Sequence, residues 1–184
     1  DIILSRLPGQ LRAIFGPQHG VRGADQDNMI ETGHSKEHGL DIPVFSLYSD
    51  SRRPASEMLD LIDTLIIDLQ DVGTRVYTFI TTMLYCMQAA ADARKRVLIL
   101  DRPNPVGGDI IEGNLLEKEF LSFVGPYTMP MRHGLTMAEM AALLNERLDI
   151  GCDLSHVKMD GWKRSMFWKD TGLRWLMPSP NMPN

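Results

Sequence analysis

Residues 64–79 read Thr-Leu-Ile-Ile-Asp-Leu-Gln-Asp-Val-Gly-Thr-Arg-Val-Tyr-Thr-Phe, and this stretch decides the fold. Its apolar run, residues 65–67, ends in a polar turn that contains Asp68, Gln70 and Asp71. Consecutive apolar positions are typical of a strand that is covered on both faces, as in a parallel sheet. Ligands of such sheets bind in the crevice beyond the carboxyl ends of the strands, so this turn is the first candidate site.

Apolar runs and helical periods alternate along the rest of the chain. Strands are expected at residues 11–15, 43–47, 65–67, 97–100 and 157–159, and helices at 54–62, from about 75, and from 136 to about 148. Residues 24–41 are polar and show no period, and we expect a long loop there. Strands that alternate with helices predict an α/β fold with a doubly wound, mostly parallel sheet and helices on both faces.

Two of the expected helices carry specific local signals. The helix that begins near Arg75 has an apolar stripe at a spacing of three to four residues, which suits a helix that covers a sheet: Val76, Ile80, Met83, Leu84, Met87 and Ala91. The later helix opens with a capping box, in which Thr136 is the N-cap and Glu139 lies three residues on.

Length and composition exclude several classes of protein. The 184 residues suffice for one full domain, and a net charge of −5 without a dense Lys/Arg cluster argues against a nucleic-acid partner. No apolar run approaches the roughly 18 residues that a membrane span needs. Cys86 and Cys152 do not form a disulfide framework, and Cys86 is expected to be a small core residue. The oligomeric state is not readable.

Polar residues gather at the expected strand ends and at the turn before the last helix. They are Gln18, His19 and Arg22; Asp68, Gln70 and Asp71; Asp101, Arg102 and Asn104; and Arg132 with His133. Parallel topology brings successive strand ends to one rim of the sheet, so we expect these groups to converge. Without a glycine-rich phosphate loop, such a set suits a sugar or an acid/base site.

Several of these residues have a purely structural alternative. Asp71 could simply cap the helix that follows it. His133 could anchor its turn by a backbone hydrogen bond, and the sequence leaves both roles open. His34 and His38 mimic a metal pair but lack a third ligand, so no metal is predicted. No P-loop, G-x-G-x-x-G or G-x-S-x-G motif is present, which disfavours a nucleotide cofactor and covalent acyl chemistry.

Five motifs, in order along the whole chain, together resemble the NamZ-type family, also called DUF1343. They are Phe15-Gly-Pro-Gln-His-Gly-Val-Arg-Gly23, Asp68-Leu-Gln-Asp-Val-Gly-Thr-Arg-Val-Tyr77, Asp101-Arg-Pro-Asn-Pro105, Arg132-His-Gly-Leu-Thr136 and Pro178-Ser-Pro-Asn-Met-Pro183. The resemblance implies an exo-β-N-acetylmuramidase that acts on peptidoglycan fragments ending in β-1,4-linked N-acetylmuramic acid (MurNAc), without a nucleotide cofactor.

The resemblance also implies a domain organisation. Residues 1–184 would form a single Rossmann-like domain that bears most of the active site, as a fragment without the first strand and a smaller C-terminal domain. Cell-wall chemistry favours a periplasmic or secreted location, with a cytoplasmic one left open.

The first motif departs from the family pattern at its catalytic position. Typical members have a Glu, the proposed catalytic acid, where this chain has Gln18. An amide cannot donate a proton as a general acid, a role that contributes typically ~10²–10⁴-fold. Another carboxylate would then be needed, and the candidates in order are Asp71, Glu112 and Glu31. We expect His19 to position Asp71 or the substrate.

Arginine side chains suit the lactyl carboxylate of MurNAc, since guanidinium binds carboxylates with two hydrogen bonds. The candidates are Arg22, Arg75, Arg102 and Arg132, and the other expected substrate-binding residues are Gln70, Tyr77, Asp101, Asn104, His133 and Asn181. The sequence therefore predicts a glycoside hydrolase. The alternative that Gln18 motivates is a non-hydrolytic module that binds cell-wall sugars, and a nucleotide-binding domain is the weakest reading.

Overall fold

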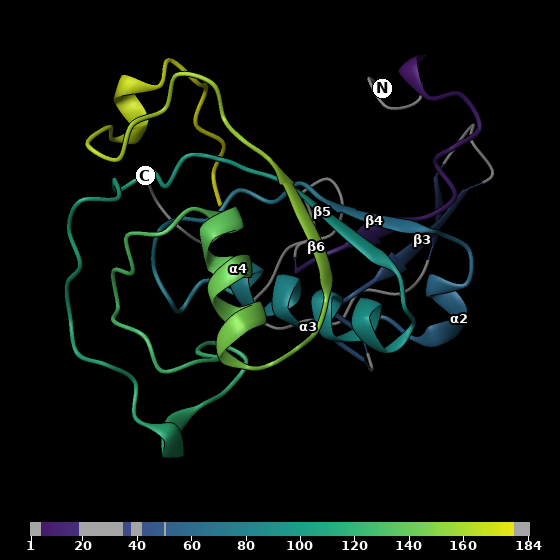
Figure 1. The fold of residues 1–184 in the computed structure, drawn as a ribbon. Coiled ribbons are helices and arrows are strands. Elements are labelled where there is room, and N and C mark those ends of the chain that lie inside the picture. The colour runs from purple at the N-terminus through teal and green to yellow at the C-terminus, as the bar shows by residue number, and fades with distance from the viewer. Residues whose placement is uncertain (1–4, 19–34, 38–41, 50, 179–184) are drawn as a thin grey trace. The chain divides into compact units, whose positions relative to one another are not determined.

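The structure, a computed structural model, describes residues 5–18, 35–37, 42–49 and 51–178 (Figure 1). The chain forms two compact units, residues 1–63 with 177–184, and residues 64–176. The expected α/β class with mostly parallel strands is confirmed in these ranges.

The unit of residues 1–63 contains a sheet in the order β1-β3-β2. Strands β1 (Ile14–Gly16) and β3 (Ile42–Ser46) pair in parallel, close to the two expected positions, and β2 (Ser35–Glu37) pairs antiparallel with β3. The expected loop at residues 24–41 is therefore wrong at β2, because cross-strand pairing with β3 overrides a polar sequence of weak strand propensity. Helix α2 (Ser56–Leu59) is shorter than the helix expected there.

The unit of residues 64–176 is built on three parallel strands in the order β4-β5-β6. They are β4 (Thr64–Ile67), β5 (Arg96–Leu100) and β6 (Asp153–Val157). The last strand was expected at 157–159 and begins four residues earlier. Its sequence, Asp-Leu-Ser-His-Val, has no apolar run because most of β6 is exposed at the edge of the sheet.

Helices α3 (Phe79–Asp92) and α4 (Met137–Arg147) pack on one side of these strands, in contact with β5 and with each other (Figure 1). The buried side chains beneath them alternate along the strands, as a pleated sheet requires. They include Leu65 and Ile67 from β4 and Val97 and Ile99 from β5, and the helices bury Ile80, Met83 and Met87 of α3 and Met140 and Leu144 of α4.

Helix α3 begins at Phe79, four residues after the expected start. Residues 74 and 75 instead join the loop that precedes α4, because Thr74 forms an isolated bridge with Arg132 and the Arg75 amide donates to the Met131 carbonyl at 2.9 Å. Val76 consequently lies outside the helix and is 46% exposed, so its place in the apolar stripe was wrong.

The capping box of α4 is confirmed. The Glu139 amide donates to Thr136 Oγ1 at 3.3 Å, and the Thr136 amide donates to Glu139 Oε2 at 3.0 Å. The same helix end is tied to the sheet through Asp101, the residue that follows β5. Two short 3-10 helices, Lys118–Phe120 and Trp168–Asp170, lie in the irregular segments before α4 and after β6. Within the described ranges, no helix has the length and apolar character to cross a membrane.

Candidate active site

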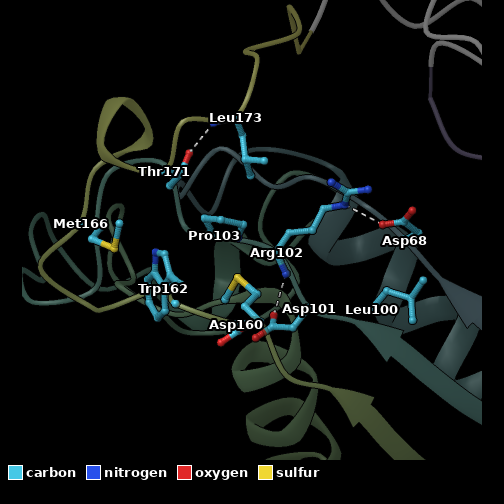
Figure 2. Close-up of a pocket in the computed structure, with 12 residues that line it drawn as sticks. Asp68, Leu100, Asp101, Arg102, Pro103, Asp160, Trp162, Met166, Thr171 and Leu173 are labelled. Carbon is cyan, nitrogen blue, oxygen red and sulfur yellow. Dashed lines mark hydrogen bonds and ion pairs between the residues drawn. The ribbon is translucent and has the colours of Figure 1, made fainter.

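A pocket of about 490 Å³ lies where the carboxyl ends of β4, β5 and β6 meet (Figure 2). Its walls come from the end of β4, the end of β5, the turn after β6 and the segment that follows that turn. The lining residues are Asp68, Leu100, Asp101, Arg102, Pro103, Met159, Asp160, Gly161, Trp162, Met166, Thr171 and Leu173. The pocket therefore lies at the carboxyl ends of the parallel strands, where the sequence predicted a site.

The most accessible charged pair in this pocket joins Asp68 and Arg102. Arg102 Nε donates to Asp68 Oδ1 at 2.6 Å, and both side chains are more than one-third exposed (Figure 2). This hydrogen bond raises the pKa of Arg102 above its ordinary value, so the guanidinium stays charged. Among the described residues, no group accepts a hydrogen bond from its two terminal nitrogens, which can therefore bind an anionic ligand.

Asp101 lines the same pocket, but its carboxylate is engaged within the protein. Oδ1 accepts hydrogen bonds from the amides of Arg102 and Ala138, both at 3.0 Å, and Oδ2 accepts one from Thr136 Oγ1 at 2.9 Å. Asp101 thus links the end of β5 to the N-terminus of α4, where a negative charge is favoured by the helix dipole. Its predicted role in substrate binding stays a prediction beside this structural one.

Asp71 and His133 form a buried pair outside the set of residues that line the pocket. Asp71 Oδ2 accepts a hydrogen bond from the Gly73 amide at 2.7 Å and lies 3.2 Å from His133 Nε2. The helix-cap alternative for Asp71 was wrong, because its carboxylate accepts from Gly73 in the turn after β4 and α3 begins only at Phe79. Its second oxygen, Oδ1, is buried and accepts no hydrogen bond from the part of the chain that the structure describes.

His133 is oriented by its own turn. Its Nδ1 accepts a hydrogen bond from the Leu135 amide at 3.1 Å, so the ring proton of a neutral imidazole resides on Nε2, which faces Asp71. The anchoring role that the sequence left open is therefore present. Burial raises the pKa of the Tyr77 hydroxyl above its ordinary value. The negative charge of Asp71 makes a smaller contribution in the same direction.

Two amide side chains expected to bind substrate are engaged with the backbone. Gln70 Nε2 donates to the carbonyls of Asp71 and Pro103, at 2.7 and 2.9 Å. Asn104 is buried; its Nδ2 donates to the Leu135 carbonyl at 2.9 Å and its Oδ1 accepts from the Val106 amide at 3.1 Å. Gln70 thus connects the turn after β4 to the turn after β5, and Asn104 connects the turn after β5 to the turn before α4.

Arg75 and Arg132, two of the four arginines expected to bind a carboxylate, contact the protein itself. Arg75 is buried, and its Nη1 donates to the carbonyls of Asn114 and Met129, at 2.6 and 2.8 Å. Arg132 pairs with Glu112 at 2.6 Å and also donates to the Val106 carbonyl. Within the described ranges, Arg102 is the arginine of this set that lines the pocket.

Of the remaining expected site residues, the structure describes only Gln18. Gln18 is half-buried in the unit of residues 1–63. His19, Arg22, Glu31 and Asn181 lie outside the described residues, as do His34 and His38. The predicted convergence of the first motif with Asp71 therefore stays a prediction.

The structure adds Asp160 and Trp162 to the site, and the sequence interpretation missed both. They follow β6 directly, in the turn at its carboxyl end. The signal was present, because Asp160 comes immediately after the strand expected at 157–159, but the sequence interpretation took its candidate residues from the ends of three other strands and from the turn before the last helix.

Comparison with known proteins gives consistent results. A family model described as "Exo-beta-N-acetylmuramidase NamZ, N-terminal" matches residues 1–184. A Bacillus subtilis (strain 168) protein named peptidoglycan beta-N-acetylmuramidase NamZ is 48% identical over 183 residues, which cover 100% of this chain and 44% of that protein.

Two solved structures of DUF1343 family proteins from Bacteroides fragilis NCTC 9343 share the fold. One is 44% identical with a TM-score of 0.84 and covers 92% of this chain and 42% of that chain. The other is 31% identical with a TM-score of 0.76 and covers 90% of this chain and 43% of that chain. The chain thus spans less than half the length of these relatives. Because the family model matches the whole chain and the sequence relative is 48% identical to it, this chain belongs to the NamZ N-terminal family.

Proposed function

We propose that the protein hydrolyses the glycosidic bond of a terminal MurNAc residue in peptidoglycan fragments. The observation that carries this proposal is the match of the NamZ family model along all 184 residues, together with 48% identity to a relative named as a peptidoglycan β-N-acetylmuramidase. The activity belongs to that relative by name and is extended to this protein as our proposal.

The pocket at the ends of β4, β5 and β6 supports a saccharide ligand. Sugar rings combine a polar rim of hydroxyl groups with apolar C–H faces, and binding sites for such molecules combine apolar walls with a small number of placed polar groups. Here Leu100, Met159 and Trp162 supply apolar surface, and Asp160 and Arg102 supply charged groups.

Arg102 is our candidate for recognition of the lactyl carboxylate, the group that distinguishes MurNAc from N-acetylglucosamine (GlcNAc). Its Nε is occupied by Asp68, which fixes the guanidinium plane and leaves the two terminal nitrogens for a ligand. A carboxylate can accept two parallel hydrogen bonds from those nitrogens. Arg75 and Arg132 are weaker candidates because Arg75 is buried against backbone carbonyls, Arg132 is paired with Glu112, and neither lines the pocket.

Asp71 remains our first candidate for the catalytic carboxylate, ahead of Glu112 and Glu31, because Gln18 cannot act as a general acid. His133 Nε2 faces one oxygen of Asp71, and the other oxygen accepts no hydrogen bond from the described residues. Glu112 is engaged by Arg132 and is largely exposed. We expect Asp71→Asn to abolish turnover.

A second candidate function follows from Gln18 alone. A site that keeps its shape but lacks its acid binds MurNAc-containing fragments without cutting them, because acid–base catalysis contributes typically ~10²–10⁴-fold to the rate.

One experiment separates the two functions: release of free MurNAc from MurNAc-GlcNAc by the full-length protein and by its Gln18→Glu variant. Turnover by the native protein means that another carboxylate carries the acid role. Turnover only in the variant means that the native protein binds without cutting. No release by either protein contradicts the proposed substrate.

A further inference from the structure

We propose that the turn Asp160-Gly161-Trp162 is a saccharide-binding subsite, in which the Trp162 ring packs against the apolar face of a pyranose and Asp160 accepts a hydrogen bond from a ring hydroxyl. The inference rests on the proposed function, since it assigns a part of the pocket to a part of the sugar. It adds a binding element that none of the five sequence motifs contains.

The first argument is the position of the turn. It follows β6, whose carboxyl end opens on the same pocket as those of β4 and β5. Gly161 has a φ of +76°. Glycine adopts this left-handed conformation freely, whereas a residue with a side chain would be strained in it. This conformation reverses the chain so that residues on both sides of Gly161 line the pocket.

The second argument is the exposed chemistry of Trp162. Its indole nitrogen is covered by the protein and finds no partner among the residues that the structure describes. The surface of the ring that a ligand can reach is therefore carbon. Met166 and Pro103 line the same pocket as the indole (Figure 2). Aromatic carbon surface of this kind binds by apolar contact and not by hydrogen bonding.

The third argument is that Asp160 differs from the other carboxylates of the pocket. Asp68 is paired with Arg102, and Asp101 accepts three hydrogen bonds from the protein. Asp160 is exposed and has no hydrogen-bond or ion-pair partner among the described residues. An ionised carboxylate only accepts hydrogen bonds, so a sugar hydroxyl is a fitting donor. The lactyl carboxylate would be repelled here and favoured at Arg102.

The fourth argument is that the turn is held in place from both sides. Before it, the Val157 carbonyl accepts a hydrogen bond from the Asp101 amide at 3.2 Å. After it, Arg164 pairs with Glu139 at 2.6 Å and donates to the Gly134 carbonyl at 2.7 Å. Groups fixed before the ligand arrives lose little conformational freedom on binding, which is what a preorganised subsite requires.

The test uses the full-length protein, titrated with MurNAc-GlcNAc while tryptophan fluorescence is recorded, and assayed separately for release of MurNAc. The chain contains three tryptophans, and Trp175 is a matched control because it lies in the same segment, packs on Trp168 and does not line the pocket. Trp162→Phe should lower the saccharide-dependent change in fluorescence relative to the native protein, whereas Trp175→Phe should retain it.

Binding and kinetics give the second readout. Trp162→Ala should weaken binding of the disaccharide roughly 10- to 100-fold, the range expected for loss of an apolar contact in a pocket, and should act mainly on KM. Trp162→Phe should lose less binding affinity for the disaccharide than Trp162→Ala, because it keeps an aromatic face. Asp160→Asn should weaken binding as well, with its melting temperature unchanged. Comparison of all variants by circular dichroism separates these effects from misfolding.

The outcomes distinguish the two proposals. If the native protein binds the disaccharide without cleaving it, the hydrolase proposal fails and the subsite is judged by the titration alone. If Trp162→Ala or Trp162→Phe binds as tightly as the native protein and keeps the fluorescence change, the subsite is refuted while the hydrolase proposal stands. If the native protein neither binds nor cleaves, both are refuted.

Discussion

Removing the carboxylate of Asp101 should destabilise the unit of residues 64–176 by roughly 2–6 kcal/mol. The Asp101→Ala variant loses hydrogen bonds from Arg102, Thr136 and Ala138, at 2.9–3.0 Å. Loss of a helix cap typically costs about 0.5–2 kcal/mol, and loss of a charge at a helix N-terminus about 0.3–1 kcal/mol. The Arg102 amide also loses its acceptor, and the net contribution of a hydrogen bond to a charged group is about 1.5–3 kcal/mol.

Urea unfolding of the full-length protein, followed by circular dichroism, measures the effect, and the melting temperature should fall by roughly 4 °C or more. Asp101→Asn keeps an oxygen acceptor, so its free energy of unfolding should fall less than that of Asp101→Ala. Asp109→Ala is the control, because Asp109 is exposed and has no hydrogen-bond or ion-pair partner in the described part of the chain, so its replacement should stay within about 0.5 kcal/mol. A change below 0.5 kcal/mol in Asp101→Ala would refute the view that this carboxylate ties β5 to α4.

Three other predictions follow from single contacts. Arg102→Gln should weaken binding of MurNAc by about tenfold or more while binding of GlcNAc changes little, and equal losses for both sugars in a calorimetric titration would contradict the role of its free nitrogens. Arg164→Ala should speed hydrogen exchange in residues 158–166, because the turn loses its link to Glu139, and unchanged exchange would argue against that link. Burial raises the pKa of Cys86 to about 12, so iodoacetamide at pH 8 should leave this thiol unmodified until urea unfolds the protein; alkylation of the native protein would show that the thiol is accessible.

Local patterns in the sequence were sufficient for the regular elements. The apolar run at residues 65–67 and the run at 97–100 became β4 and β5, although the fully buried side chains alternate along both strands and Ile66 is 39% exposed in the described part of the chain. The capping box at Thr136 and Glu139 formed as expected, because both partners lie within one helical turn of each other. The pocket at the strand ends followed from the parallel topology alone.

Local patterns failed where tertiary contacts compete with them. Residues 75–78 suit a helix, but the backbone of Arg75 pairs with Met131 and so delays α3 to Phe79. Strand β2 is polar and forms by pairing with β3, and β6 lacks an apolar run because it lies at an edge. Such elements depend on partners that are distant in sequence.

The sequence by itself determined which polar residues stand at the strand ends and which family pattern they follow. Only the tertiary structure decided what each of them contacts. Arg75 and Arg102 are equivalent in sequence terms, yet one is buried against backbone carbonyls and the other faces the pocket beside Asp68. The partners in these contacts are 34 to 54 residues apart along the chain. Side-chain charge is fixed by the residue type, but burial and pairing depend on which distant segments the fold brings together.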